Sequence, residues 1–130
     1  GDVAIGMQWQ GDGIAPALIA RHRRGADIVQ AELSPTLLRA LDGYIGSISY
    51  SRDGTTIAAT SPRGGILDTY QSNDMALKMR TNLKEVCGVA PSSQGFTLTT
   101  GQGDYGFFAG QHTNLWRHVS QAWDNHLIQI

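Results

Sequence analysis

The chain has 130 residues, of which 41% are apolar and 16% are charged, and its formal net charge at pH 7 is −1. This composition excludes a disordered tail and a strongly basic nucleic-acid-binding segment. A chain of this length buries about two thirds of the surface that it exposes when unfolded, so a single core is expected.

All apolar runs are shorter than the roughly 18 residues of a membrane-spanning helix. The chain begins at Gly1 without a charged and apolar leader, as expected of a processed or excised protein. The single cysteine, Cys87, excludes an intramolecular disulfide, and we expect a buried structural thiol at this position.

Three glycine-ended turns recur along the chain at a constant spacing. Gly13, Gly54 and Gly95 lie 41 residues apart, and each follows an alternating apolar strand. Glycine supplies the positive φ angle that such hairpin turns need, so a second strand is expected after each turn. These second strands are predicted at residues 17–20, 56–60 and 97–100.

The later part of each repeat predicts two more strands, except in the first repeat. The expected strands are residues 66–70, 76–81, 105–111 and 115–119. In the first repeat, residues 34–41 (SPTLLRAL) instead combine a serine cap, a following proline and apolar residues at helical spacing. They predict a short helix near residues 34–42.

Four short strands in about 40 residues are the size of one propeller blade. The predicted fold is therefore all-β, with about three four-stranded propeller-like blades that form a partial β-propeller. The units are expected at residues 1–43, 44–84 and 85–122 of one domain, with a closing strand at 123–130. Closed propellers use about four to eight blades, so the missing blades belong to a longer chain or to associated copies.

Five short runs together resemble the C-terminal portion of the bacterial DUF1513 proteins, and the last run is the most distinctive. They are residues 22–25 (HRRG), 43–47 (GYIGS), 61–65 (SPRGG), 86–90 (VCGVA) and 123–127 (WDNHL). The resemblance implies a seven-bladed, WD40-like propeller exported to the periplasm, often by a twin-arginine signal and often encoded beside iron-uptake proteins. It implies no established biochemical activity.

Propeller geometry sorts the loops onto two faces, and one predicted rim concentrates the reactive side chains. The candidate ligand-binding residues on this rim are His22, Arg23, Arg24, Arg63, Asp104, Asp124, Asn125 and His126. The arginines offer planar donors to a carboxylate, a phosphate or the acidic groups of another protein. As ordinary loop charges, they would instead be solvated and would only hold the blades in register.

His126 has two interpretations. Histidine is a residue type suited to ligand binding or proton transfer, and the neighbouring Asp124 is expected to orient the His126 imidazole for either role. The structural interpretation, which we favour, is that Asp124 and Asn125 form an Asx-type turn while Trp123 packs between blades.

No catalytic residue, metal site or cofactor is predicted. The chain has no Gly-x-Ser-x-Gly elbow, and Cys87 begins a predicted inner strand with no adjacent base. His112 is expected in a turn on the opposite face and His118 on an outer strand, both away from the candidate rim.

The sequence therefore predicts a non-catalytic periplasmic scaffold that binds a protein or a small anionic ligand on the rim of Arg24, Arg63 and His126. Neither nucleic acid nor membrane insertion is expected. One alternative is a metal-assisted hydrolase or lyase that uses the rim histidines and carboxylates. The other is a structural assembly module whose exposed blade faces pair with copies of itself or with the missing blades.

Overall fold

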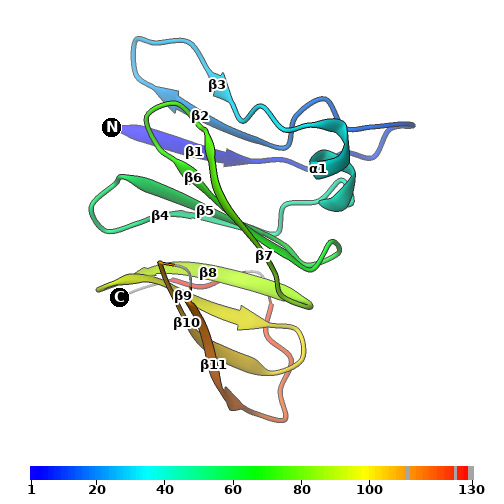
Figure 1. Ribbon diagram of the computed structural model, residues 1–130, viewed down its shortest axis with the longest axis vertical. Helices are drawn as coiled ribbons and strands as arrows, with labels where there is room; N and C mark the ends of the chain where they lie inside the picture. The colour runs from blue at the N-terminus through cyan, green and yellow to red at the C-terminus, as the bar shows by residue number, and fades with distance from the viewer. Residues whose placement is uncertain (111, 125, 129–130) are drawn as a thin grey trace.

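The computed structural model describes residues 1–110, 112–124 and 126–128, and its strands form three antiparallel sheets. Figure 1 shows the sheets stacked along the long axis of the molecule, with the first sheet at the top. The first sheet has the order β1-β2-β3 and contains β1 (Asp2–Gly6), β2 (Ile19–Arg23) and β3 (Val29–Gln30). Helix α1 (Pro35–Ala40) follows β3.

The second sheet, of order β4-β5-β6-β7, contains β4 (Ser47–Tyr50), β5 (Thr56–Ser61), β6 (Ile66–Gln71) and β7 (Leu77–Asn82). The third sheet, of order β11-β10-β9-β8, contains β8 (Val86–Ser92), β9 (Gly95–Thr100), β10 (Asp104–Ala109) and β11 (His112–His118). Three blade-like sheets and a short helix confirm the predicted fold class. In the described part of the chain, no helix is long and apolar enough to span a membrane.

The second and third sheets follow the predicted repeat. Gly54 and Gly95 have positive φ angles of 72° and 154° in the turns that lead from β4 to β5 and from β8 to β9. The strands expected at residues 56–60 and 97–100 are β5 and β9, and the later strands of both repeats are β6, β7, β10 and β11. The strand predictions for these two repeats are confirmed.

The first sheet is shifted by one strand relative to the predicted repeat. The strand expected to run toward Gly13 ends at Gly6, and residues 7–9 then run antiparallel to residues 43–45, just before β4. The N–H of Ile45 donates to the carbonyl of Met7 at 3.2 Å, and the N–H of Trp9 donates to the carbonyl of Gly43 at 2.8 Å. β1 therefore runs opposite to β4 and occupies the place of a second blade strand.

The helix predicted after the first repeat is confirmed. The side chain of Ser34 accepts a hydrogen bond from the N–H of Leu37 at 3.4 Å, and Pro35 occupies the first turn, where its missing N–H costs nothing. The helix lies in the connection between β3 and β4. The helix does not replace a strand. β2 and β3 correspond to the third and fourth strands of the other sheets, and α1 follows them as an additional element.

Apolar side chains fill the two spaces between neighbouring sheets. Successive side chains of a strand point to opposite faces, so Ile57 and Ala59 of β5 pack toward the first sheet and Ala58 packs toward the third. Full burial of a large apolar side chain contributes roughly 1.5–3 kcal/mol. Such residues are Leu18, Ile19, Leu41 and Ile57 in the first space and Leu67, Val89, Phe96 and Leu98 in the second. Cys87 is buried, as predicted.

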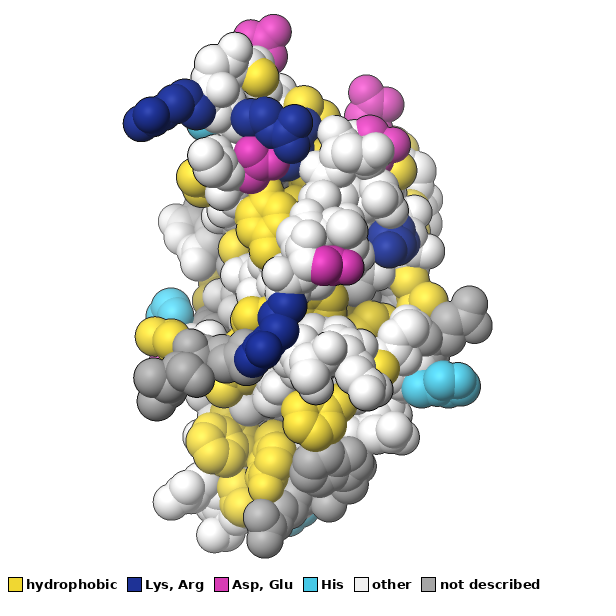
Figure 2. Space-filling model, turned by 90° about the vertical axis from the view of Figure 1, so that its left-hand side faces the viewer, with side chains coloured by type: hydrophobic (Ala, Val, Ile, Leu, Met, Phe, Trp, Pro, Cys, Tyr) yellow, Lys and Arg dark blue, Asp and Glu magenta, His cyan; other side chains and the backbone are white. Residues whose placement is uncertain are grey.

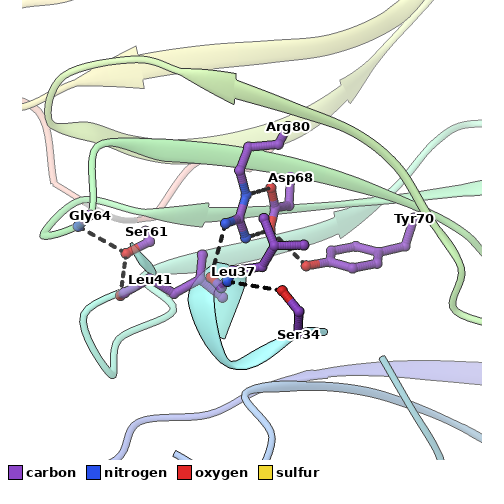
Figure 3. A network of polar contacts seen from close by, with 8 residues as sticks. All are labelled: Ser34, Leu37, Leu41, Ser61, Gly64, Asp68, Tyr70 and Arg80. Carbon is purple, nitrogen blue, oxygen red and sulfur yellow. Dashed lines mark hydrogen bonds and ion pairs between the residues drawn. The ribbon is translucent and has the colours of Figure 1, made fainter. Parts of the chain in front are cut away.

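A polar network joins α1 to the second sheet (Figure 3). Arg80 of β7 donates to both carboxylate oxygens of the fully buried Asp68 on β6 and also to the carbonyl of Leu37 at 2.9 Å. The hydroxyl of Ser61 donates to the carbonyl of Leu41 at 2.7 Å and accepts from the N–H of Gly64 at 3.1 Å. The helix is thus fixed through its backbone carbonyls, which a helix end leaves without intrahelical partners.

Candidate functional site

The strands run between two ends of the molecule, which we call the hairpin end and the helix end. The hairpin end, on the left in Figure 1, carries the turns that follow β2, β4, β6 and β8. The helix end, on the right, carries α1 and the turns that follow β5, β7 and β9. Side chains in these turns form a shared site only where their turns lie at the same end.

Arg24 and Arg63 lie at opposite ends. Arg24 follows β2 at the hairpin end, whereas Arg63 lies between β5 and β6 at the helix end. The Arg63 guanidinium carbon is 4.9 Å from the centre of the Tyr44 ring, within the range of a cation–π contact. The predicted common edge is therefore wrong for this pair. The first sheet begins one strand later in the repeat than expected, and this shift moves the turn after β2 to the hairpin end.

Arg23 and His22 are neighbours on β2 that point to opposite faces. Arg23 pairs with Asp2 through two short contacts, Nη2 to Oδ2 at 2.8 Å and Nε to Oδ1 at 2.9 Å. The hydrogen bond lowers the pKa of the Asp2 carboxyl and raises the pKa of Arg23. His22 instead lines a shallow hollow of about 560 Å³ with Val3 and Ile28. The two side chains therefore do not converge on one ligand.

Asp104 is a predicted site residue that pairs with a histidine. It begins β10 at the helix end, where its Oδ1 lies 3.1 Å from Nδ1 of His118. His118 ends the outer strand β11, as predicted, whereas His112 begins that strand instead of lying in the preceding turn. Within residues 1–110, 112–124 and 126–128, no group of three or more His, Cys, Asp or Glu side chains is placed to hold a metal ion.

The C-terminal segment lies along the first strands of the second and third sheets. A Cβ at Gly88 would lie 3.5 Å from the carbonyl oxygen of Asp124. His126 lines a hollow of about 390 Å³ together with Ser47 of β4. Asn125 falls outside the described residues. The predicted site residues are thus distributed over several places, and their role in ligand binding stays a prediction.

A cleft of about 680 Å³ opens at the hairpin end between the second and third sheets. Its rim carries the cations Arg52 and Lys78 and the neutral side chains of two neighbouring hairpin tips, residues 51–55 and 92–95. Phe96 and Phe108, which are almost fully buried, contribute to its apolar wall. Figure 2 faces this end and shows basic side chains, with acidic ones among them, over its upper and middle parts and mainly apolar side chains below.

The carboxylate of Asp53 in the cleft is held within its own turn through its Oδ1. Asp53 accepts hydrogen bonds from the hydroxyl of Ser51 at 2.6 Å and from the N–H and hydroxyl of Thr55 at 3.0 and 2.9 Å. These bonds, with that from Ser51 the strongest, lower the pKa of Asp53 from 3.8 to about 2. Arg52 and Lys78 form no ion pair with any described carboxylate, so both positive charges face the cleft and solvent.

Replacing Ser51 with alanine is expected to raise the pKa of Asp53 from about 2 toward 3.8, because the strongest bond to the ionised form is lost. A lowered pKa stabilises the fold above the unfolded pKa, and this contribution disappears as the pH falls from about 4 to about 2. Carbon-detected NMR of the Asp53 carboxyl group measures the midpoint of its pH titration directly. Ser93→Ala, in the neighbouring hairpin tip, is the control, and equal midpoints in the two variants would contradict the assignment.

The residues of this cleft were not predicted as a site, because the predicted site lies on the rim opposite to the β4–β5 and β8–β9 hairpins. The motif SRDGTT at residues 51–56 and the motif PSSQG at residues 91–95 lie at corresponding places of two repeats. Corresponding turns of stacked sheets meet at one end. The repeat alone therefore predicts that these two turns lie next to each other.

One protein-family profile, described as "Protein of unknown function (DUF1513)", matches residues 1–130. No curated protein and no solved structure matches the chain significantly.

Proposed function

The chain belongs to the DUF1513 family, and we propose that it is a non-catalytic binding module whose cleft holds an acidic, partly apolar peptide. The observation that supports this proposal is the cleft between the second and third sheets, in which unpaired cations lie above an aromatic wall. A volume of about 680 Å³ is within the roughly 300–1,000 Å³ typical of ligand pockets.

The arrangement of charges favours an anionic group over a cationic one. The three hydrogen bonds that Asp53 accepts all reach its Oδ1 and hold the carboxylate in its own turn, and the two cations Arg52 and Lys78 outnumber this single negative charge. Lys78 donates to the hydroxyl of Thr56 at 3.0 Å, which holds its ammonium group at the cleft. A carboxylate placed between Arg52 and Lys78 would form charge-assisted hydrogen bonds with both.

The polar tips and the aromatic wall favour a peptide over a bare anion. Hydroxyl and amide side chains at residues 92–94 offer hydrogen bonds to a peptide backbone, and Phe96 and Phe108 offer contact to an apolar side chain. An acidic residue next to an apolar one would use both parts of the cleft.

We propose further that the module is part of a closed propeller in the periplasm. Support for the ring comes from the stack of blade-like sheets and from the 41-residue spacing of Gly54 and Gly95 in the second and third sheets. Support for the periplasm and for a link to iron uptake comes from the family resemblance alone.

Titration with two synthetic peptides tests the proposed site. One peptide alternates glutamate and leucine, and the other carries glutamine in place of glutamate. The acidic peptide is expected to shift the amide NMR signals of residues 51–56 and 92–95, and the glutamine peptide to bind more weakly. Combined Arg52→Gln and Lys78→Gln substitution is expected to weaken binding about tenfold, which corresponds to about 1.4 kcal/mol.

Arg63→Gln provides the control and is compared with Arg52→Gln alone, because each removes one arginine charge and Arg63 lies at the opposite end of the molecule. It is expected to leave the peptide affinity unchanged. The proposal fails if both peptides bind equally, if the shifted signals lie at the helix end, or if raising the salt concentration does not weaken binding.

A further inference from the structure

A buried hydroxyl in the wall of the cleft has no hydrogen-bond partner. Thr69 on β6 is 4% exposed and lines the cleft between the second and third sheets. Its hydroxyl forms no hydrogen bond with any described residue and stays open to the cleft. The other buried polar side chains in the described part of the chain all take part in hydrogen bonds: Arg21, Thr60, Ser61, Asp68, Thr99 and Thr100. A buried hydroxyl normally has a partner, so that of Thr69 points to one that comes from outside the chain.

A β-bulge turns Lys78 toward the same cleft. Thr69 pairs with Met79 and Tyr70 pairs with Leu77, so Lys78 is an extra residue of β7 without a partner on β6. Consecutive side chains of a regular strand point to opposite faces, yet Lys78 and Met79 both line the cleft. The bulge therefore places a cation on the face of the second sheet that carries Thr69.

Lys78 and Thr69 lie on neighbouring rows of that face. Nζ of Lys78 is 3.0 Å from the hydroxyl oxygen of Thr56 on β5. Thr56 pairs with Gln71 and Ala58 pairs with Thr69, so Thr56 and Thr69 are diagonal neighbours, about 7–8 Å apart along the backbone and closer at their side chains. A carboxylate accepts hydrogen bonds on both of its oxygens, so one carboxylate can join the ammonium group and the hydroxyl.

The opposite wall of the cleft is aromatic. Phe96 on β9 pairs with Phe108 on β10, and both residues line the cleft from the third sheet. Arg52 and Asp53, in the turn after β4, are the other charged side chains described along the cleft, so cations outnumber carboxylates. An anionic group is therefore favoured against the second sheet and an apolar group against the third.

We propose that Thr69 is a specificity-determining residue of the cleft and that its hydroxyl donates to the carboxylate bound by Lys78. The inference rests on the proposed function and names the ligand group that the second sheet binds. A hydrogen bond to a charged acceptor is about twice as strong as one between neutral groups, so Thr69 adds to the preference for an acid over an amide. A glutamate side chain and a free C-terminus supply the same carboxylate.

Calorimetric titration of the full chain with three peptides tests the role of Thr69. The first is the glutamate and leucine peptide with an amidated C-terminus, the second has glutamine for glutamate, and the third has glutamine and a free C-terminus. Thr69→Val is expected to weaken a peptide whose carboxylate reaches the site about tenfold. The second peptide is expected to lose only about threefold, because its acceptor is neutral. A tenfold loss for the first peptide identifies a side-chain carboxylate, and one for the third identifies the terminal carboxylate.

Thr97→Val is the matched control. Thr97 pairs with Phe107, and both alternate with the inward-facing Phe96 and Phe108, so Thr97 lies on the outer face of the third sheet. This substitution is expected to leave all three affinities unchanged. The urea midpoint of Thr69→Val is expected to equal that of the wild type, because the removed hydroxyl has no partner in the described chain.

Two results would overturn the inference and leave the proposed function standing. One is an equal loss for the acidic and the neutral peptides in Thr69→Val, and the other is binding of the acidic peptide that does not change in this variant. A lowered urea midpoint would also contradict it, since the hydroxyl would then have a partner within the fold. If none of the three peptides binds the wild-type chain, the proposed function fails as well.

Discussion

Replacing Arg80 with methionine is expected to lower the free energy of unfolding by about 3–5 kcal/mol, because the substitution leaves the Asp68 carboxylate buried without its cation. Asp68 is fully buried, and Arg80 reaches it with Nη2 2.6 Å from Oδ2 and Nε 2.7 Å from Oδ1. The hydroxyl of Tyr70 donates to the same carboxylate at 2.8 Å. The substitution also removes the hydrogen bond from Arg80 to the carbonyl of Leu37 in α1.

The buried Asp68 carboxylate also helps to explain why the pKa values of Tyr70 and Arg80 are raised. Burial raises the pKa of the Tyr70 hydroxyl, and the adjacent Asp68 charge raises it further, so Tyr70 remains a donor. The bond to Asp68 raises the pKa of Arg80 in turn. Tyr70 therefore stays a neutral donor and Arg80 stays a cation, and removal of Arg80 leaves the buried Asp68 without its ion-pair partner.

Urea denaturation followed by circular dichroism measures the loss of stability in Arg80→Met. A double variant, Asp68→Leu with Arg80→Met, is expected to recover part of the loss, since it removes the buried charge together with its partner. Lys78→Met lies on the same strand but is exposed, so its effect is expected to stay within about 0.5 kcal/mol. A loss no larger in Arg80→Met than in Lys78→Met would contradict the interpretation of the network.

The repeat predicted the second and third sheets because their strands are short, alternate in polarity and are joined by glycine turns. Each of these features is local, so spacing alone placed the turns at Gly54 and Gly95 correctly. The helix was predictable for the same reason, since Ser34 and Pro35 act on adjacent residues. Local chemistry is what a single sequence reports most directly.

The first sheet was mispredicted because Gly13 imitates the other turn glycines. It has the same spacing and a positive φ of 84°, but it lies in the long connection between β1 and β2. The direction of β1 is set by contacts distant in sequence, in which residues 7–9 pair with residues 43–45. Because Gly13 was assigned to a hairpin turn, the predicted strands of the first sheet were shifted by one strand. This shift led to the incorrect prediction that Arg24 and Arg63 lie on the same rim.

The candidate cleft depends on the same kind of long-range information. Arg52 and Lys78 belong to different strands of one sheet, and the tip at residues 92–95 belongs to the next sheet. Their approach follows from how two sheets stack, through contacts such as Ala58 and Leu67 with Phe96 and Leu98. Charged residues at turn tips are common, so their spacing in the sequence does not distinguish a cleft from a solvated surface.

Replacing Gly103 with alanine is expected to lower the free energy of unfolding by about 3 kcal/mol or more, because two separate costs combine. Gly103 has a φ of 95°, a backbone conformation that side chains with a Cβ disfavour by about 1–3 kcal/mol. In addition, a Cβ at this position would meet the carbonyl oxygens of Val119 and Gln121, which are backbone atoms and cannot rotate away. The clash falls where the N–H of Val119 donates to the carbonyl of Gly103 at 3.0 Å.

Gly54→Ala separates the two costs. Gly54 also has a positive φ, of 72°, but a Cβ there would meet no atom within 4 Å. Its loss of stability is therefore expected to be only about 1 kcal/mol, the cost of the backbone conformation alone. The difference between the two variants, measured by urea denaturation, gives the energy with which the chain after β11 is held against the turn between β9 and β10. Equal losses would mean that the segment at Val119 moves aside without cost and is not fixed by this contact.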